Sequence, residues 1–311
     1  MSSHGRYFSS ETLPRLVVIL FCALLAGCTA PFFQPMRGYP ITPAAIGLRY
    51  RTVRFRVQHD LLTGWFLPAK GCARGSILFV HGNGQDMSTQ IGSVYWLPAA
   101  HYNVFAFDYQ GYGTSSGTPT FARGVADVGR ALAVLSHLPG VDPRRIVVFG
   151  QSLGGAFAIS ALAHLKHPRG VRALVTEGAF ADYREIARET LSRFWFTWAL
   201  QWPLSYAVPD RFSPVRAIAK VAPIPVLIID SVHDEVVPVV NAYQLYRAAR
   251  PPKTLWIVHH GGHIQAFNDL KHRLQLIAHL RAWLGPAVCP GGSGGSHRNQ
   301  NFSRGIRADR H

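Results

Sequence analysis

Short apolar runs that alternate with helical stretches restrict the fold of this chain more than any other feature. The runs are Ile77–Val80, Val104–Phe107, Ile146–Phe149, Ala173–Val175, Val226–Ile229 and Leu255–Val258. The helical patterns between and after them are Gly124–Leu138, Gly155–Leu165, Val240–Ala249 and Asp269–Leu284. Strands that carry apolar side chains on both faces are typical of a parallel sheet that helices cover on both sides. The pattern therefore predicts an α/β fold with a mostly parallel, twisted sheet.

Residues 46–284 are expected to form one domain, because the alternation of apolar runs and helical stretches continues through them without a linker. Before the first run, apolar and polar residues alternate from Thr52 to Gln58, which predicts a half-exposed strand with residues 62–67 as its hairpin partner. After the domain, residues 285–311 are expected to be a disordered tail, since Gly, Ser, Asn and Arg dominate from Gly291 onward.

The N-terminus predicts a secreted protein. Basic residues precede an uncharged run at residues 16–27, LVVILFCALLAG. This run is shorter than the roughly 20 apolar residues that span a bilayer, and it has the features of a secretory signal. Its end, Leu25-Ala26-Gly27-Cys28, resembles the lipobox of bacterial lipoproteins, in which the cysteine becomes the lipidated first residue. An ordinary signal peptide or an uncleaved anchor is the alternative.

The lipobox resemblance implies that residues 1–27 form a signal peptide that is removed and that Cys28 is lipidated. Residues 28–45, which are Pro-rich from Pro31 to Pro43, would then tether the domain to the membrane. Thr29, rather than Asp, after the cysteine favours the outer over the inner membrane. The expected location is the periplasmic face of the bacterial cell envelope.

Two cysteines, Cys72 and Cys289, would remain in the mature domain. An oxidising compartment permits a disulfide between them. Two free thiols are an equal alternative, and the sequence does not decide between them.

The net charge of +16 first suggests a nucleic-acid partner. However, most of this charge lies on a domain that is predicted to be tethered to a membrane, and no nucleic-acid recognition motif is present. The charge therefore favours attraction to anionic lipid headgroups within a Debye length. The expected partners are the membrane and a small acyl substrate, with no nucleic acid, and the chain is expected to be a monomer.

A candidate nucleophile lies at Gly150-Gln151-Ser152-Leu153-Gly154, directly after one apolar run and before an apolar helical pattern. This is the Gly-x-Ser-x-Gly elbow in the strand–turn–helix context that it requires. Glycines on both sides permit the sharp turn, and the helix N-terminus behind Ser152 favours a developing anion. We therefore expect Ser152 to be exposed above the sheet as a nucleophile.

Serine needs a base and a group that orients the base. Asp234 and His263 follow the last two apolar runs, in the chain order expected for this architecture. Asp230 and Glu235 are rival acids, and His260 is a rival base. A metal site is a further alternative, built from His233, Asp234, His260 and His263. Because it would leave the serine elbow without a purpose, we expect neither a metal nor a cofactor.

An oxyanion hole needs two backbone N–H groups, one of them from the residue after the nucleophile. Leu153 is expected to provide the first. Asn83, in the His81-Gly82-Asn83-Gly84 segment that follows the first apolar run, is expected to provide the second. His81 is expected to hold this loop by hydrogen bonding rather than to take part in catalysis.

One segment, residues 181–223, lacks a strand and collects aromatic residues on several faces of its helical pattern. A short helical lid over an apolar pocket is the functional interpretation. A packed core helix is the alternative.

These motifs together resemble the α/β-hydrolase superfamily. The resemblance rests on His81–Gly84, Asp108–Gly117, Gly150–Gly155, His233–Pro238 and Gly261–His263, which occur in the family's order between Leu78 and Leu284. The chain is most similar to small-lid, membrane-associated α/β-hydrolase-domain proteins, which include acyl-protein thioesterase-like enzymes. The resemblance implies an α/β-hydrolase fold, a structural role for Asp108, and ester or thioester cleavage through an acyl-enzyme.

The expected function is therefore that of a serine hydrolase of the carboxylesterase, thioesterase or lipase type, with Ser152, Asp234 and His263 as its catalytic residues. A serine peptidase of the same fold is one alternative. A non-catalytic, lipid-anchored binding protein is another, which the complete set of three residues disfavours. The sequence does not identify the substrate.

Overall fold

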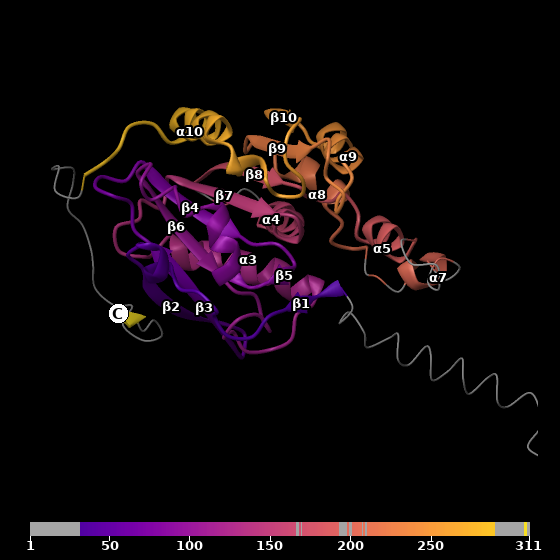
Figure 1. The fold of residues 1–311 in the computed structure, drawn as a ribbon, viewed down its shortest axis with the longest axis horizontal. Helices are drawn as coiled ribbons and strands as arrows, with labels where there is room; N and C mark the ends of the chain where they lie inside the picture. Colours follow the sequence, from indigo (N-terminus) through magenta and orange to yellow (C-terminus); the bar gives the residue numbers. More distant parts are fainter. Residues whose placement is uncertain are drawn as a thin grey trace, which may run out of the picture.

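A computed structural model of the protein describes residues 32–165, 168, 170–192, 198, 201–206, 208, 210–289 and 308–309 (Figure 1). Its centre is a nine-stranded sheet with the order β10-β9-β8-β7-β4-β6-β3-β2-β11. The predicted signal peptide and Cys28 lie outside the described residues, as does most of the predicted tail. In the described part of the chain, no helix is both long enough and apolar enough to cross a bilayer.

Six neighbouring strands of the sheet are parallel, and each contains one of the apolar runs. They are β4 (Gly75–Val80), β6 (Tyr102–Phe107), β7 (Ile146–Gln151), β8 (Val171–Glu177), β9 (Val226–Ser231) and β10 (Lys253–Val258). The alternating segment forms the antiparallel hairpin β2 (Arg51–Val57) and β3 (Asp60–Leu67). A two-residue strand, β11 (Ala308–Asp309), pairs with β2.

Helices cover both faces of this sheet, as the continuous apolar strands predict. On one face lie α3 (Phe121–Leu135), α4 (Leu153–His164), α8 (Pro214–Ala217) and α9 (Val240–Ala248). On the other lie α2 (Met87–Gln90) and α10 (Leu270–Leu284). Short 3-10 turns occur at Pro43–Ile46, Ile91–Ser93, Ile218–Lys220 and Ala266–Asn268. The predicted α/β-hydrolase class of fold, with a mostly parallel sheet, is confirmed.

Two further helices, α5 (Tyr183–Ser192) and α7 (Gln201–Tyr206), lie beyond the end of the sheet in Figure 1. They belong to the segment for which we expected a lid or a packed core helix. Trp198, Trp202 and Tyr206 are 62%, 57% and 62% exposed. These three aromatic residues therefore do not form a buried core stripe.

The described part of the predicted tether packs against the domain. Strand β1 (Gln34–Pro35) pairs in parallel with β5 (Gly84–Gln85), and Phe33 is only 5% exposed. The ring of Phe33 contacts the ring of Phe121, at the start of α3, with their centroids 5.1 Å apart. The chain from Phe32 onward is therefore part of the folded unit, because its aromatic side chains find an apolar site on α3.

The pair of cysteines that the sequence leaves open is joined by a disulfide between Cys72 and Cys289. The neighbouring backbone is paired as well, since the Val288 N–H donates to the Ala73 carbonyl oxygen at 2.9 Å. The first residues of the predicted tail are thereby held against the start of β4.

Substitution of Phe33 tests whether this N-terminal segment belongs to the domain. Phe33→Ala removes a buried ring, and we expect the free energy of unfolding to fall by about 3 kcal/mol. Ile41→Ala, at a 36% exposed position of the same segment, is the control and should change it little. Thermal or denaturant unfolding measures both variants. Equal stability of Phe33→Ala and the parent protein would show that the segment is only a tether.

Candidate active site

Ser152 lies at the turn between β7 and α4, in a backbone conformation that side chains seldom adopt. Its φ and ψ angles are 52° and −122°, which is the strain expected of a nucleophile elbow. A Cβ on Gly150 would lie 2.6 Å from the Gly154 carbonyl oxygen. A Cβ on Gly154 would collide with the carbonyl oxygens of Val80 and His81, at the end of β4. Both glycines are therefore required by close approach of the backbone.

The loop after β10 brings His263 to the acid that the sequence favours. His263 Nδ1 lies 2.6 Å from Asp234 Oδ2, and the Asp234 side chain is almost fully buried. The other carboxylate oxygen of Asp234 accepts from the N–H groups of Val236 and Val237 at 2.9 and 2.8 Å. These bonds fix the carboxylate, so Nε2 of His263 is the ring nitrogen left to exchange a proton.

Asp230, the first rival acid, lies on β9, one residue before its end at Ser231, and His263 bonds to Asp234 instead. One of its oxygens accepts from the Ser231 N–H at 2.8 Å, and the other is buried without a hydrogen-bond partner among the described residues. Burial, together with the neighbouring Asp234 charge, raises the pKa of Asp230 well above its ordinary value. A carboxyl group that holds its proton stabilises an imidazolium poorly. The other rivals, Glu235 and His260, are exposed.

Glu177 is a buried carboxyl group that the sequence analysis did not select. It ends β8, and its two oxygens accept from Gln151 Nε2 at 2.7 Å and from the Ala266 N–H at 2.9 Å. Its carbonyl oxygen accepts from the Ser152 N–H at 2.9 Å. Burial raises the pKa of Glu177 to about 7. This one residue thus connects the serine elbow to the loop that carries His263.

The amides expected to stabilise an oxyanion face a common cavity. Asn83 and Leu153 both line it, and within the described part of the chain neither backbone N–H donates to another group. The loop before Asn83 is held by Gln90, which accepts from the Gly82 N–H at 2.7 Å. Free amides beside a serine are the arrangement that a developing oxyanion requires.

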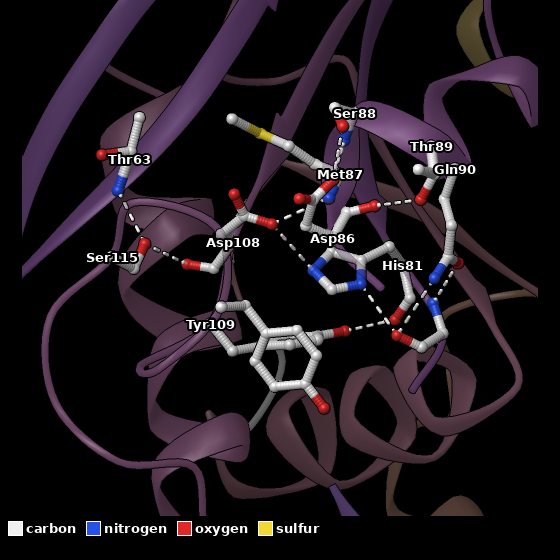
Figure 2. A network of polar contacts seen from close by, with 12 residues as sticks. Thr63, His81, Asp86, Met87, Ser88, Thr89, Gln90, Asp108, Tyr109 and Ser115 are labelled. Carbon is white, nitrogen blue, oxygen red and sulfur yellow. Dashed lines mark hydrogen bonds and ion pairs between the residues drawn. The ribbon is translucent and has the colours of Figure 1, made fainter. Parts of the chain in front are cut away.

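His81 and Asp108 form a buried network next to this loop, which Figure 2 shows. His81 Nε2 lies 3.4 Å from Asp108 Oδ1, and neither side chain is exposed. The same Asp108 oxygen accepts from the Met87 N–H at 2.8 Å, and its other oxygen accepts from the Tyr39 hydroxyl at 2.8 Å. Asp108 therefore ties β6 to α2 and to the N-terminal segment.

A cavity of about 590 Å³ opens over the elbow, and Ser152, Leu153, Asn83 and His263 all line it. This volume suits a small-molecule site. Much of its remaining wall is apolar, from Phe121, Phe180, Ile186, Val236 and Val237. Its described lining contains no Asp, Glu, Lys or Arg. The cavity therefore suits an uncharged, largely apolar group.

Residues from two further segments complete this cavity, the N-terminal segment and the segment for which a lid was the functional interpretation. Phe32 and Gln34 reach it from the N-terminal segment, and Ile186 and Thr190 reach it from α5. The aromatic pair Phe32-Phe33 in an otherwise Pro-rich stretch is the signal that marks the first segment. The spacing of four residues in α5 places Ile186 and Thr190 on one helix face.

The alternative metal site finds no support in this geometry. His233 and His260 are exposed, and the oxygens of Asp234 are engaged with His263 and two backbone amides. Among the described residues, no group of three or more His, Cys, Asp or Glu side chains converges to hold a metal ion.

Comparisons with known proteins identify relatives of this chain. A family model described as serine aminopeptidase, S33, matches residues 71–211. The uncharacterized protein YfhR of Escherichia coli is 35% identical over 232 residues, which cover 72% of this chain and 78% of YfhR. The alpha/beta hydrolase domain-containing protein WAV2 of Arabidopsis thaliana is 33% identical, over 71% of this chain and 74% of WAV2.

Solved structures show the same fold. The Pyrococcus furiosus esterase Pf2001 superposes with a TM-score of 0.67 at 20% identity, over 81% of this chain and 98% of that chain. Acetyl xylan esterase 1 from Thermoanaerobacterium superposes with a TM-score of 0.57 at 17% identity, over 74% of this chain and 83% of that chain.

Paired substitutions distinguish the two buried aspartates. Asp234→Asn should lower kcat on a short p-nitrophenyl ester by about 10⁴-fold, because an amide at this position favours the wrong imidazole tautomer. Asp230→Asn is the matched control, and it should leave kcat within about ten-fold of the parent. Steady-state kinetics with circular dichroism as a check of folding measure both. The reverse order of effects would assign the acid to Asp230.

Proposed function

Because the chain belongs to the α/β-hydrolase superfamily, we propose that it cleaves carboxylic ester or thioester bonds through an acyl-enzyme intermediate on Ser152. The observation that carries this proposal is the 2.6 Å bond between His263 and Asp234 at the cavity that Ser152 also lines. This bond holds one imidazole nitrogen and leaves the other for the serine.

In the first step, His263 Nε2 takes the proton of the Ser152 hydroxyl while Oγ of Ser152 attacks the acyl carbon. Asp234 keeps the ring in the required tautomer and stabilises the imidazolium. The carbonyl oxygen becomes negative and accepts from the Asn83 and Leu153 amides. His263 then returns the proton to the departing alcohol or thiol. Water repeats the sequence on the acyl-enzyme and releases the carboxylic acid.

The cavity wall supports an acyl substrate over a charged one. An aminopeptidase, which the S33 family description names, binds the free amine of its substrate. An acidic side chain is the natural partner of that amine, and the described lining has none. The apolar wall accommodates a hydrocarbon chain without leaving a buried charge unpaired. We therefore rank ester and thioester cleavage above peptide cleavage.

The location is also part of the proposal. The lipobox-like end of the apolar N-terminal run supports lipidation of Cys28 and attachment to the periplasmic face of the cell envelope. Residues 28–285 carry a net charge of +12, which supports a domain that lies close to anionic headgroups.

Replacement of the nucleophile tests the chemistry. Ser152→Ala should lower hydrolysis of p-nitrophenyl butyrate by at least about 10³-fold, while the fold persists, because the variant lacks the hydroxyl that forms the proposed acyl-enzyme. A fluorophosphonate probe should label the parent protein and not the variant. Labelling of both proteins, or undiminished hydrolysis by the variant, would exclude Ser152 as the nucleophile.

The scissile bond is tested by comparing butyryl substrates with an amino acid anilide that carries a free amine. A butyryl ester and a butyryl thioester should be turned over at least about 100-fold faster than alanine p-nitroanilide, because the cavity offers no partner for an amine. Faster cleavage of the anilide would favour the peptidase.

Replacement of the lipidation site tests the location. Cys28→Ala should lose the mass of the attached acyl chains and remain an unprocessed precursor, since the cysteine is the residue that receives the lipid. Mass spectrometry and fractionation of the envelope measure this outcome, with Cys22→Ala as the control that is processed normally. Unchanged mass and processing in Cys28→Ala would contradict the lipid anchor.

A further inference from the structure

The N-terminal segment reaches the cavity very close to the proposed lipid anchor. Phe32 and Gln34 line the cavity, and Asn83 fixes them there. The Asn83 side-chain oxygen accepts from the Gln34 N–H at 3.2 Å, and its amide nitrogen donates to the Phe32 carbonyl oxygen. The chain is thus fastened to the same loop that offers an oxyanion donor.

The length of chain between Cys28 and this point limits how far the cavity can lie from the membrane. Phe32 is four residues after Cys28, and four residues span at most about 14 Å when fully extended. A segment this short cannot act as a long flexible linker. Lipids attached to Cys28 therefore keep this side of the domain within about two Debye lengths of the bilayer surface.

Helix α5 lies on the same side, because it contributes to the wall of the same cavity. Ile186 and Thr190 face the cavity. Arg184 and Arg188, on another face of the helix, lie over the rings of Tyr206 and Trp202. The guanidinium carbons are 5.4 and 4.6 Å from the two ring centroids. Helix α5 therefore connects the cavity to α7.

The segment that contains α5, Trp198 and α7 has the composition of a membrane interface. Trp198, Trp202 and Tyr206 are each more than half exposed, and none of them lines the cavity. Between residues 193 and 209 the sequence has six aromatic residues and no acidic residue. Aromatic rings with neighbouring arginines are typical of segments that lie among lipid headgroups.

Two acidic side chains near this surface are bonded within the domain, and one of them is Asp210, whose Oδ2 lies 3.9 Å from Nη1 of Arg184. Glu185 Oε1 accepts from Gln244 of α9 at 3.4 Å. The guanidinium group of Arg188 over the exposed ring of Trp202 complements an anionic lipid surface.

We propose that β1, α5 and α7 form a face that docks on an anionic phospholipid bilayer, with the cavity open toward it. Acyl chains of lipids in the same leaflet then enter the cavity directly and present their ester or thioester bond to Ser152. This inference rests on the proposed function and narrows its substrate class to acyl groups held in the membrane. Trp198 and Trp202 bind the interface, whereas Ile186 and Phe32 contact the acyl chain.

The test compares two substrates with the lipidated protein reconstituted in vesicles of phosphatidylethanolamine and phosphatidylglycerol. One substrate is a long-chain umbelliferyl ester embedded in the vesicles, and the other is p-nitrophenyl acetate in solution. For Trp198→Ala/Trp202→Ala, the ratio of vesicle to solution activity should fall by roughly ten-fold or more, because two aromatic rings lose their interfacial burial. Activity in solution should persist and shows that the variant is folded.

The control is Leu270→Ala/Leu274→Ala, which removes two side chains that are 66% and 58% exposed on α10. In Figure 1 this helix lies at the opposite end of the domain from α7. The control should keep the parent ratio. An unchanged ratio in the tryptophan variant, an equal fall in the leucine variant, or an equal loss of both activities in the tryptophan variant would overturn the docking face.

Failure of the proposed function is recognised separately. It would appear in the parent protein as the absence of both solution activity and fluorophosphonate labelling. A parent protein that is labelled and active, combined with an unchanged ratio in the tryptophan variant, would overturn the docking face alone.

Discussion

The approach of the elbow to the end of β4 is the constraint on which the rest of the site depends. The backbone at Gly154 passes so close to the carbonyl oxygens of Val80 and His81 that no side chain fits there. This contact places the free amide of Leu153 beside the loop that carries Asn83. It also holds Ser152 in a strained conformation that points its side chain at the cavity. One steric condition thereby brings the proposed nucleophile and both proposed oxyanion donors together.

Buried carboxyl groups organise the opposite side of the site. Asp234 holds His263, while Glu177 binds Gln151 on the elbow and the Ala266 amide three residues after His263. The elbow and the histidine loop are thus joined through a single side chain as well as through the sheet. Burial raises the pKa of Glu177 to about 7, so a change of its charge near neutral pH acts on both loops together.

The sequence predicts those parts of the molecule that depend on local pattern. Uniformly apolar runs identify the parallel strands, and the two glycines around Ser152 identify the elbow. Asp234 and His263 are found because both follow strands that end at the same edge of the sheet. The missed features all depend on contacts between distant segments. The ring of Phe33 packs on the ring of Phe121 on α3, and the carboxylate of Glu177 accepts from the Ala266 N–H, 89 residues away. The Cys72–Cys289 pair, which the sequence left open, likewise joins residues that are 217 positions apart. No local periodicity encodes such pairs.

The N-terminal segment packs against the domain beside the cavity. If Cys28 is lipidated, the cavity, helices α5 and α7 and the anchor lie on one side of the domain, and the basic charge favours attraction of this side to an anionic membrane. The chemistry remains the central claim, and it is tested most directly by trapping the intermediate. Rapid acid quenching after mixing with p-nitrophenyl butyrate, followed by peptide mass spectrometry, should show one butyryl group on Ser152. Continued turnover with no adduct, or with the adduct on another residue, would contradict the account.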